Sequence, residues 1–249
     1  MILFEEVMAY IADYDPEFPD SIEAATKGDI LELEALTGRE LPEVYRNFLD
    51  VMGRNTGWLN IQNLDFRIGT VLEYYRRDNA LPVDEFFRIG SDTKDPSYNP
   101  HLQMSLVAPE LKVVAFPGCT LGTFAETTAR HMKWIAGSMQ EMFSRPAFRI
   151  YEIFGPWREP VVIRVDKSQS GQIDRLESML LGEYALEPEF WSSSQVRGYK
   201  SSEMAVEAAQ LGGQPLEIHL RANDLDKQRS IARTLATKFE AQVSAPSAT

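Results

Sequence analysis

The chain has few of the residues from which metal centres and disulfide frameworks are built. Its 249 residues include a single cysteine, Cys119, and three histidines. One cysteine cannot form an intramolecular disulfide, and scattered histidines without an HExxH or His-x-His spacing do not predict a metal site. A cysteine nucleophile needs a base nearby. His131 lies twelve residues further along, but nothing in the sequence shows that it comes close in space, so we favour a small buried thiol over a Cys119–His131 pair.

Enzyme motifs are also missing. The sequence contains no Walker loop, no GxGxxG fingerprint and no GxSxG nucleophile elbow. Carboxylates are so abundant that a catalytic pair could be drawn almost anywhere, and their number therefore specifies none. We expect no catalytic residue, no bound metal and no cofactor, and we keep an enzyme as the third alternative among the functions considered below.

No long hydrophobic run is present, which argues against a membrane-spanning segment. The N-terminal stretch MILFEEVMAY carries Glu5 and Glu6 where a secretory signal would carry basic residues. Hydrophobic residues make up 44% of the chain and charged residues 25%, as in ordinary globular proteins. We predict a cytoplasmic protein that does not bind a membrane and is long enough for one large or two small domains.

Basic residues are scarce near the N-terminus. The net charge is −12, and residues 1–50 hold 13 acidic residues against Lys27, Arg39 and Arg46, which gives 3 − 13 = −10. Because phosphate neutralisation requires clustered lysine and arginine, this charge argues against nucleic-acid binding. It favours a basic protein partner, whose approach the negative field would accelerate. The alternative is that these carboxylates only keep a helical N-terminus solvated.

The strongest periodic pattern lies in residues 41–52. Apolar residues recur there at the spacing of one helical stripe: Leu41, Val44, Tyr45, Phe48, Leu49 and Met52. Pro42 suits the first helical turn, because its missing N–H would have no intrahelical partner. Gly53 is expected to end the helix with a positive φ. By itself this pattern predicts a buried amphipathic helix.

Weaker patterns predict the remaining elements. The expected helices cover 3–14, 21–36, 69–78, 130–143 and two segments near 173–180 and 225–239. The expected strands cover 58–61, 85–89, 111–116, 161–165 and 216–220, and the stretch SDTKDPSYNP is expected to be a loop. In the second helix Ile22, Ile30, Leu33 and Leu36 should face inward. His219 alternates with apolar neighbours, so it should face solvent from its strand.

The order of Gly38, the Leu41-Pro42 pair, the Tyr45-x-x-Phe48-Leu49 helix and Gly57 resembles the signature of the SUKH superfamily, the Smi-type domain. The resemblance covers about residues 20–150 of this chain. Further along, a strand ending in Ile-Gly with an aspartate soon after, and an Ile-Ala-x-Ser segment, are similar to later parts of the family pattern. These later positions are Ile89, Gly90, Asp92, Ile135, Ala136 and Ser138.

The resemblance implies an α+β fold, with helices packed on one face of a mostly antiparallel sheet over residues 1–152. Residues 153–243, which it does not cover, are expected to form a smaller C-terminal α/β extension, and residues 244–249 a frayed tail. The implied function is that of a bacterial immunity protein, which binds and blocks a cognate protein toxin without chemistry. A regulatory adaptor of the Smi type and an enzyme acting as an antidote are the alternatives.

The candidate partner-binding residues combine carboxylates with aromatic side chains. Aromatic residues are favoured interface anchors, although Trp58 could instead pack in the core. Helical phase predicts Tyr75 inward and Tyr74 exposed. The expected acidic patch and the expected anchors and rim are Asp29, Glu32, Glu34, Trp58, Tyr74, Asp92, Asp95 and Tyr98.

Overall fold

The computed structural model shows an α+β protein, as predicted. It describes residues 4–59, 61, 63–77, 86–94, 98–103, 111–117, 133–155, 159–165, 171–211 and 214–244, with the backbone alone at 98–103, 116–117 and 133. The chain divides into two units, Met1–Ser144 and Arg145–Thr249.

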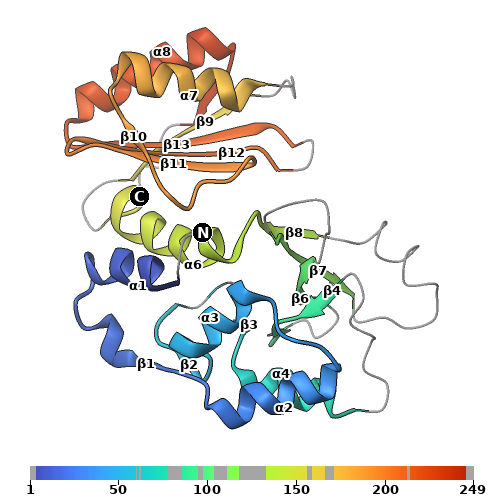
Figure 1. The fold of residues 1–249 in the computed structure, drawn as a ribbon. Helices are drawn as coiled ribbons and strands as arrows, with labels where there is room; N and C mark the ends of the chain where they lie inside the picture. The colour runs from blue at the N-terminus through green and yellow to red at the C-terminus, as the bar shows by residue number, and fades with distance from the viewer. Residues whose placement is uncertain are drawn as a thin grey trace. The chain divides into compact units, whose positions relative to one another are not determined.

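The first unit combines helices with a small antiparallel sheet (Figure 1). Its helices are α1 (Phe4–Ala12), η1 (Phe18–Ser21), α2 (Lys27–Thr37), α3 (Glu43–Met52) and α4 (Ile68–Tyr75). The sheet runs in the order β4 (Phe86–Arg88), β6 (Tyr98–Gln103), β7 (Val113–Pro117) and β8 (Lys133–Ala136). Two short antiparallel pairs join β1 (Ile22–Glu23) to β2 (Asn55–Thr56) and β3 (Leu64–Asp65) to β5 (Ser91–Asp92).

Helix α3 supplies the centre of the first unit's core, which confirms the prediction for residues 41–52. Tyr45 and Phe48 are fully buried; the Phe48 ring stacks on Phe143 with centroids 4.9 Å apart, and Tyr45 lies 5.4 Å from Phe87 of β4. Burying each such side chain contributes about 1.5–3 kcal/mol. The periodic stripe therefore positions α3 between the sheet and the other helices.

The expected role of Gly53 was wrong. Its φ is −66°, and the positive φ values occur at Gly38 (67°) and Gly57 (59°) instead. Gly53 is required for space: a Cβ there would lie 2.8 Å from both the Leu49 carbonyl oxygen and the Ala25 Cβ. The end of α3 is thus packed against the segment before α2.

Four expected elements differ in the structure. The stretch SDTKDPSYNP, expected to be a loop, contains β5 and the first residues of β6. The helix expected over 21–36 begins only at Lys27, after β1, and residues 58–59 and 61 form no strand. The helix expected over 130–143 is replaced by β8 and by α6 (Met139–Phe148). Helix α6 begins there because Ser138 Oγ accepts the Glu141 N–H at 3.0 Å, while Glu141 Oε2 accepts the Gly137 N–H at 2.9 Å.

The second unit has one six-stranded antiparallel sheet. Its elements are η2 (Arg149–Ile153), β9 (Val161–Val165), α7 (Gln172–Glu183), β10 (Glu187–Pro188), β11 (Val196–Lys200), β12 (Met204–Ala209), β13 (Leu216–Ala222), α8 (Leu225–Phe239) and β14 (Gln242–Ser244). The strand order is β10-β11-β12-β13-β9-β14. The order β14-β9-β13-β12, connected through α7 and α8, is the split β-α-β arrangement, and both helices lie on one face of the sheet (Figure 1).

The other face of this sheet is covered as well. Residues of β12 are buried on both faces, and η2 contacts β12 and β13. Glu207 of β12 and its cross-strand neighbour His219 of β13 lie under this cover, so His219 is only 8% exposed. The expectation that His219 faces solvent was therefore wrong, because the alternation in β13 could not show that a second layer covers its polar side.

The division between the units lies inside α6, before the expected boundary at 152–153. Side chains just after Ser144 pack within the second unit, where Phe148 meets Trp191 with ring centroids 5.3 Å apart. Ser244, the first residue of the expected tail, ends β14, and residues 245–249 lie outside the described residues. In the described part of the chain, no helix combines the length and the hydrophobicity needed to cross a membrane.

Candidate functional site

Helix α2 carries the three carboxylates expected to form an acidic patch. Its start is determined locally, because Thr26 Oγ1 accepts the Asp29 N–H at 3.2 Å and Asp29 Oδ2 accepts the Thr26 N–H at 2.9 Å. This reciprocal pair is a capping box. Partial burial raises the pKa of Asp29, but hydrogen bonds from Thr26 and Arg54 outweigh it, so the pKa lies below its ordinary value of 3.8.

Each of these carboxylates has an arginine partner in the structure. Asp29 Oδ2 lies 2.9 Å from Arg54, and Glu32 Oε1 lies 2.7 Å from Arg76. Glu34 pairs with Arg46 and also accepts the Leu41 N–H at 3.0 Å. Partly exposed ion pairs of this kind contribute about 0–1 kcal/mol each. Asp29, Glu32 and Glu34 therefore tie α2 to its neighbours and add little free negative charge; their part in partner binding stays a prediction.

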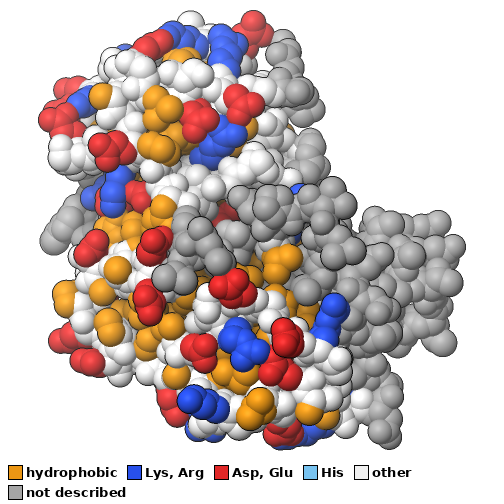
Figure 2. All heavy atoms as spheres, viewed as in Figure 1, with side chains coloured by type: hydrophobic (Ala, Val, Ile, Leu, Met, Phe, Trp, Pro, Cys, Tyr) orange, Lys and Arg blue, Asp and Glu red, His pale blue; other side chains and the backbone are white. Residues whose placement is uncertain are grey.

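Between these ion pairs, α2 exposes an apolar ridge, which we define as Leu31 and Ala35. Ile30 and Leu33 face the core, as predicted, whereas Leu36 is partly exposed instead of buried. Leu31 is 65% exposed, the largest value among the exposed large hydrophobic residues of the described chain. Acidic and basic side chains lie side by side over the α2 region of the first unit, with hydrophobic side chains between them (Figure 2).

Free acidic charge is found on α1 and α3. Five exposed carboxylates form no ion pair with any described basic side chain. We call them the acidic surface: Glu5, Glu6, Asp13, Glu43 and Asp50. The two helices are in contact, with Phe4 and Phe48 ring centroids 5.5 Å apart. The charge excess of residues 1–50 predicted such a surface, but not these residues, which are identifiable only as the outward positions of the two helices.

Trp58 lies apart from α2 and has a structural role. Its Nε1 donates a hydrogen bond to Asp15 Oδ2 at 2.7 Å, and its ring meets Phe18 edge-on at 5.3 Å. The side chain is half-buried. Trp58 therefore ties the segment after β2 to the turn after α1, and its use as a partner anchor stays a prediction.

Tyr74 lies on α4, next to α2, and is held by Arg88. The Arg88 guanidinium stands 4.0 Å from the centre of the Tyr74 ring, and it also donates to the Gly90 carbonyl at 2.9 Å. Tyr75 is buried, as predicted, and its hydroxyl accepts the Arg88 N–H at 2.9 Å. Tyr74 is half-buried, so it offers one edge rather than a whole ring to a partner.

The remaining candidates do not join α2. Asp92 lies on β5, where its Oδ1 accepts the Lys94 N–H at 2.8 Å in a tight turn. The Tyr98 backbone begins β6, opposite Pro117, and its side chain lies outside the described part. Asp95 also lies outside the described residues. Of the eight candidates, the structure brings together the three carboxylates of α2 and, on the neighbouring α4, Tyr74.

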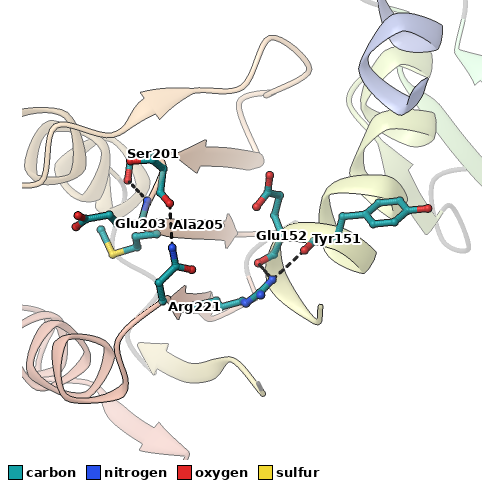
Figure 3. Close-up of a pocket in the computed structure, with 9 residues that line it drawn as sticks. Tyr151, Glu152, Ser201, Glu203, Ala205 and Arg221 are labelled. Atoms are coloured by element: carbon teal, nitrogen blue, oxygen red, sulfur yellow. Dashed lines mark hydrogen bonds between the residues drawn. The ribbon is translucent and has the colours of Figure 1, made fainter. Parts of the chain in front are cut away.

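The second unit contains a small polar recess of about 120 Å³ (Figure 3). At one side Arg221 Nη1 donates to the carbonyl oxygens of Tyr151 and Glu152, at 2.8 and 2.9 Å. Glu203 at the other side pairs with Lys227, and this hydrogen-bonded pair lowers the pKa of Glu203. The recess is smaller than the roughly 300–1,000 Å³ of most ligand pockets, and its charged groups already have partners. We do not assign it a ligand.

The described residues contain no group of three or more His, Cys, Asp or Glu side chains arranged to hold a metal ion.

No family model and no curated protein matches the chain.

Proposed function

We propose that this protein is a cytoplasmic immunity protein of the SUKH type, which binds and blocks a cognate bacterial toxin. Two observations support the proposal. The sequence from Gly38 to Gly57 resembles the SUKH signature, and the carboxylates of the acidic surface on α1 and α3 are exposed and have no basic partner within the described part of the chain. The acidic surface is the observation on which the proposal mainly depends, because free charge of one sign suits a partner of the opposite sign.

The partner should therefore be a protein with a basic surface. Surfaces with many lysine and arginine residues are typical of proteins that act on nucleic acids, because such proteins must neutralise phosphates. An acidic inhibitor would compete with the phosphate backbone for that surface. A hydrogen bond to a charged group contributes about 1.5–3 kcal/mol, so a few of them with an apolar contact could reach nanomolar affinity, about −12 kcal/mol.

Co-expression tests the proposal directly. We take the product of the neighbouring gene as the candidate toxin. It is expressed alone and together with this protein, and cell survival and co-purification are both measured. Protection together with a stable complex is the expected result. Protection without a complex would instead indicate an enzymatic antidote, and a complex with an endogenous protein without protection would indicate a regulatory adaptor.

Charge reversal then tests the acidic surface. In the variant Glu43→Lys/Asp50→Lys, we expect association with the toxin at low salt to slow by at least about tenfold, because steering depends on exposed charge. The matched control is Glu159→Lys/Asp226→Lys on the second unit, whose carboxylates are also exposed and where Asp226, like Glu43, lies in the first turn of a helix. Both variants change the net charge equally, so a similar loss in the control would contradict a specific acidic surface.

A further inference from the structure

Helix α2 has apolar residues on its buried face and also on its exposed face. Ile30 and Leu33 are buried, so the core contact of the helix is already complete without Leu31 or Ala35. Leu31, at 65% exposure, leaves most of its side chain in solvent. Single exposed leucines are common on protein surfaces, so the meaning of this one depends on what surrounds it.

The apolar ridge is held rigidly. The capping box at Thr26 and Asp29 determines where α2 begins, and Gly38, with a φ of 67°, determines where it ends. The ion pairs of Glu32 with Arg76 and of Glu34 with Arg46 connect α2 to α4 and α3 on its two sides. A partner that binds a preformed helix loses little conformational entropy on that side of the contact.

The ridge is linked to the acidic surface through one ion pair. Arg46, which pairs with Glu34 of α2, lies on α3 between Glu43 and Asp50, the two α3 carboxylates of the acidic surface. Leu31 lies one helical turn before Glu34, so this ion pair joins the helix that carries the ridge to the helix that carries Glu43 and Asp50. An apolar centre with a charged rim is the usual anatomy of a specific interface, in which a few central residues carry most of the binding energy.

We propose that Leu31 and Ala35 form the apolar anchor of the interface and that the occupant is the basic toxin. This inference rests on the proposed function and adds where on the first unit the toxin binds. The complementary site on the toxin would be an apolar depression edged by lysine or arginine. Leu31 would fill the depression, while Glu43 and Asp50 pair with the basic edge.

The test uses the full-length protein and an inactivated form of the neighbouring gene's product, with rates of association and dissociation measured separately. Leu31→Glu is the decisive variant, because glutamate keeps the helix and adds negative charge. If charge alone carried the binding, it would leave the affinity unchanged or increase it. We expect the Kd to rise at least about tenfold through faster dissociation, as for a central anchor residue.

Leu181→Glu on α7 of the second unit is the matched control, because Leu181 is also an exposed helical leucine, at 42% exposure. Its Kd should stay within about twofold of the wild-type value. Leu31→Ala, the mildest truncation, should weaken binding in the same direction as Leu31→Glu. Thermal unfolding of all three variants should match the wild type, since the altered leucines are exposed.

Two results would overturn the inference. Wild-type affinity in Leu31→Glu, together with weakened binding in Glu43→Lys/Asp50→Lys, would refute the anchor and leave the proposed function intact. Self-association of the wild-type protein that Leu31→Glu abolishes would assign the ridge to a second copy of this chain. If the wild-type protein neither binds nor protects against the toxin, the proposed function itself fails.

Discussion

The Arg145 Nη2 atom lies 2.8 Å from Oε1 of Glu207, a carboxylate with no solvent exposure on β12 of the second unit. Arg149 approaches the other carboxylate oxygen, with its Nε 3.6 Å away. A buried charge is tolerated only when it is paired, because desolvation of an isolated carboxylate costs many kcal/mol. These two arginines therefore attach the segment after Ser144 to the sheet, which explains why the second unit begins there.

Removal of the Glu207 charge should destabilise the second unit. Glu207→Gln removes the carboxylate with which Arg145 and Arg149 pair. Because both arginines stay partly exposed to solvent, we expect the free energy of unfolding in urea to fall by about 1.5–3 kcal/mol. The control is Glu217→Gln, which breaks the exposed pair with Arg164 and should cost only about 0–1 kcal/mol. Equal losses in the two variants would contradict the distinction between a buried and an exposed ion pair.

The stability of the second unit should fall in mild acid because of His219. Burial lowers the pKa of His219 below 6.5, Arg149 lowers it further, and Glu207 and Glu217 oppose the shift. The unfolded chain therefore binds a proton near pH 6.5 while the folded chain does not, so this stability is complete above that pH and is lost as the pH falls toward the folded pKa. Between about pH 8 and pH 5, the melting temperature should fall less steeply with decreasing pH in His219→Gln than in the wild type.

Replacement by alanine should change the stability of the protein in opposite directions at two glycines. Gly53→Ala places a Cβ 2.8 Å from the Leu49 carbonyl oxygen and 2.9 Å from its Cα, so backbone must move and we expect a loss of about 1–3 kcal/mol. At Gly69, near the start of α4, nothing lies within 4 Å of an added Cβ. Gly69→Ala should therefore stabilise the protein by about 0.5–1 kcal/mol. Thermal unfolding of both variants measures the two signs directly.

Trp58 should act on stability rather than on binding. Trp58→Phe removes the Nε1 donor to Asp15, and we expect the free energy of unfolding to fall by about 1–2 kcal/mol. A double-mutant cycle with Asp15→Ala isolates the energy of that hydrogen bond. The toxin affinity of Trp58→Phe should stay at the wild-type value; a large loss of affinity without a loss of stability would instead make Trp58 an interface anchor.

The elements predicted best from sequence depend on neighbours in the chain. The stripe from Leu41 to Met52 predicted α3 and its buried face, because i, i+3 and i+4 residues share a side of any helix. The prediction of a helix over 130–143 was wrong in its first half, because the spacing of apolar residues around Ile135 and Ala136 fits a strand as well as a helix. The hydrogen bonds between Ser138, Glu141 and Gly137 mark where α6 begins, and the Ser-x-x-Glu spacing that makes them is visible in the sequence.

The candidate site was predictable in composition but not in pairing. Local sequence was enough to place Asp29, Glu32 and Glu34 on one helix and to show that residues 1–50 are strongly acidic. Their arginine partners are 25, 44 and 12 residues away along the chain. Whether a carboxylate is free or neutralised depends on which distant side chains the fold brings within about 4 Å, and no periodic pattern records that.

Burial on the second face of a sheet is likewise a property of the whole fold. Alternation in β13 correctly separated the side chains that meet α7 and α8 from those that point away. It could not show that η2, about 54–70 residues earlier in the chain, would cover Glu207 and His219. Secondary structure follows from short-range sterics and periodicity, whereas the cover over a polar face comes from a long-range contact that only the folded chain makes.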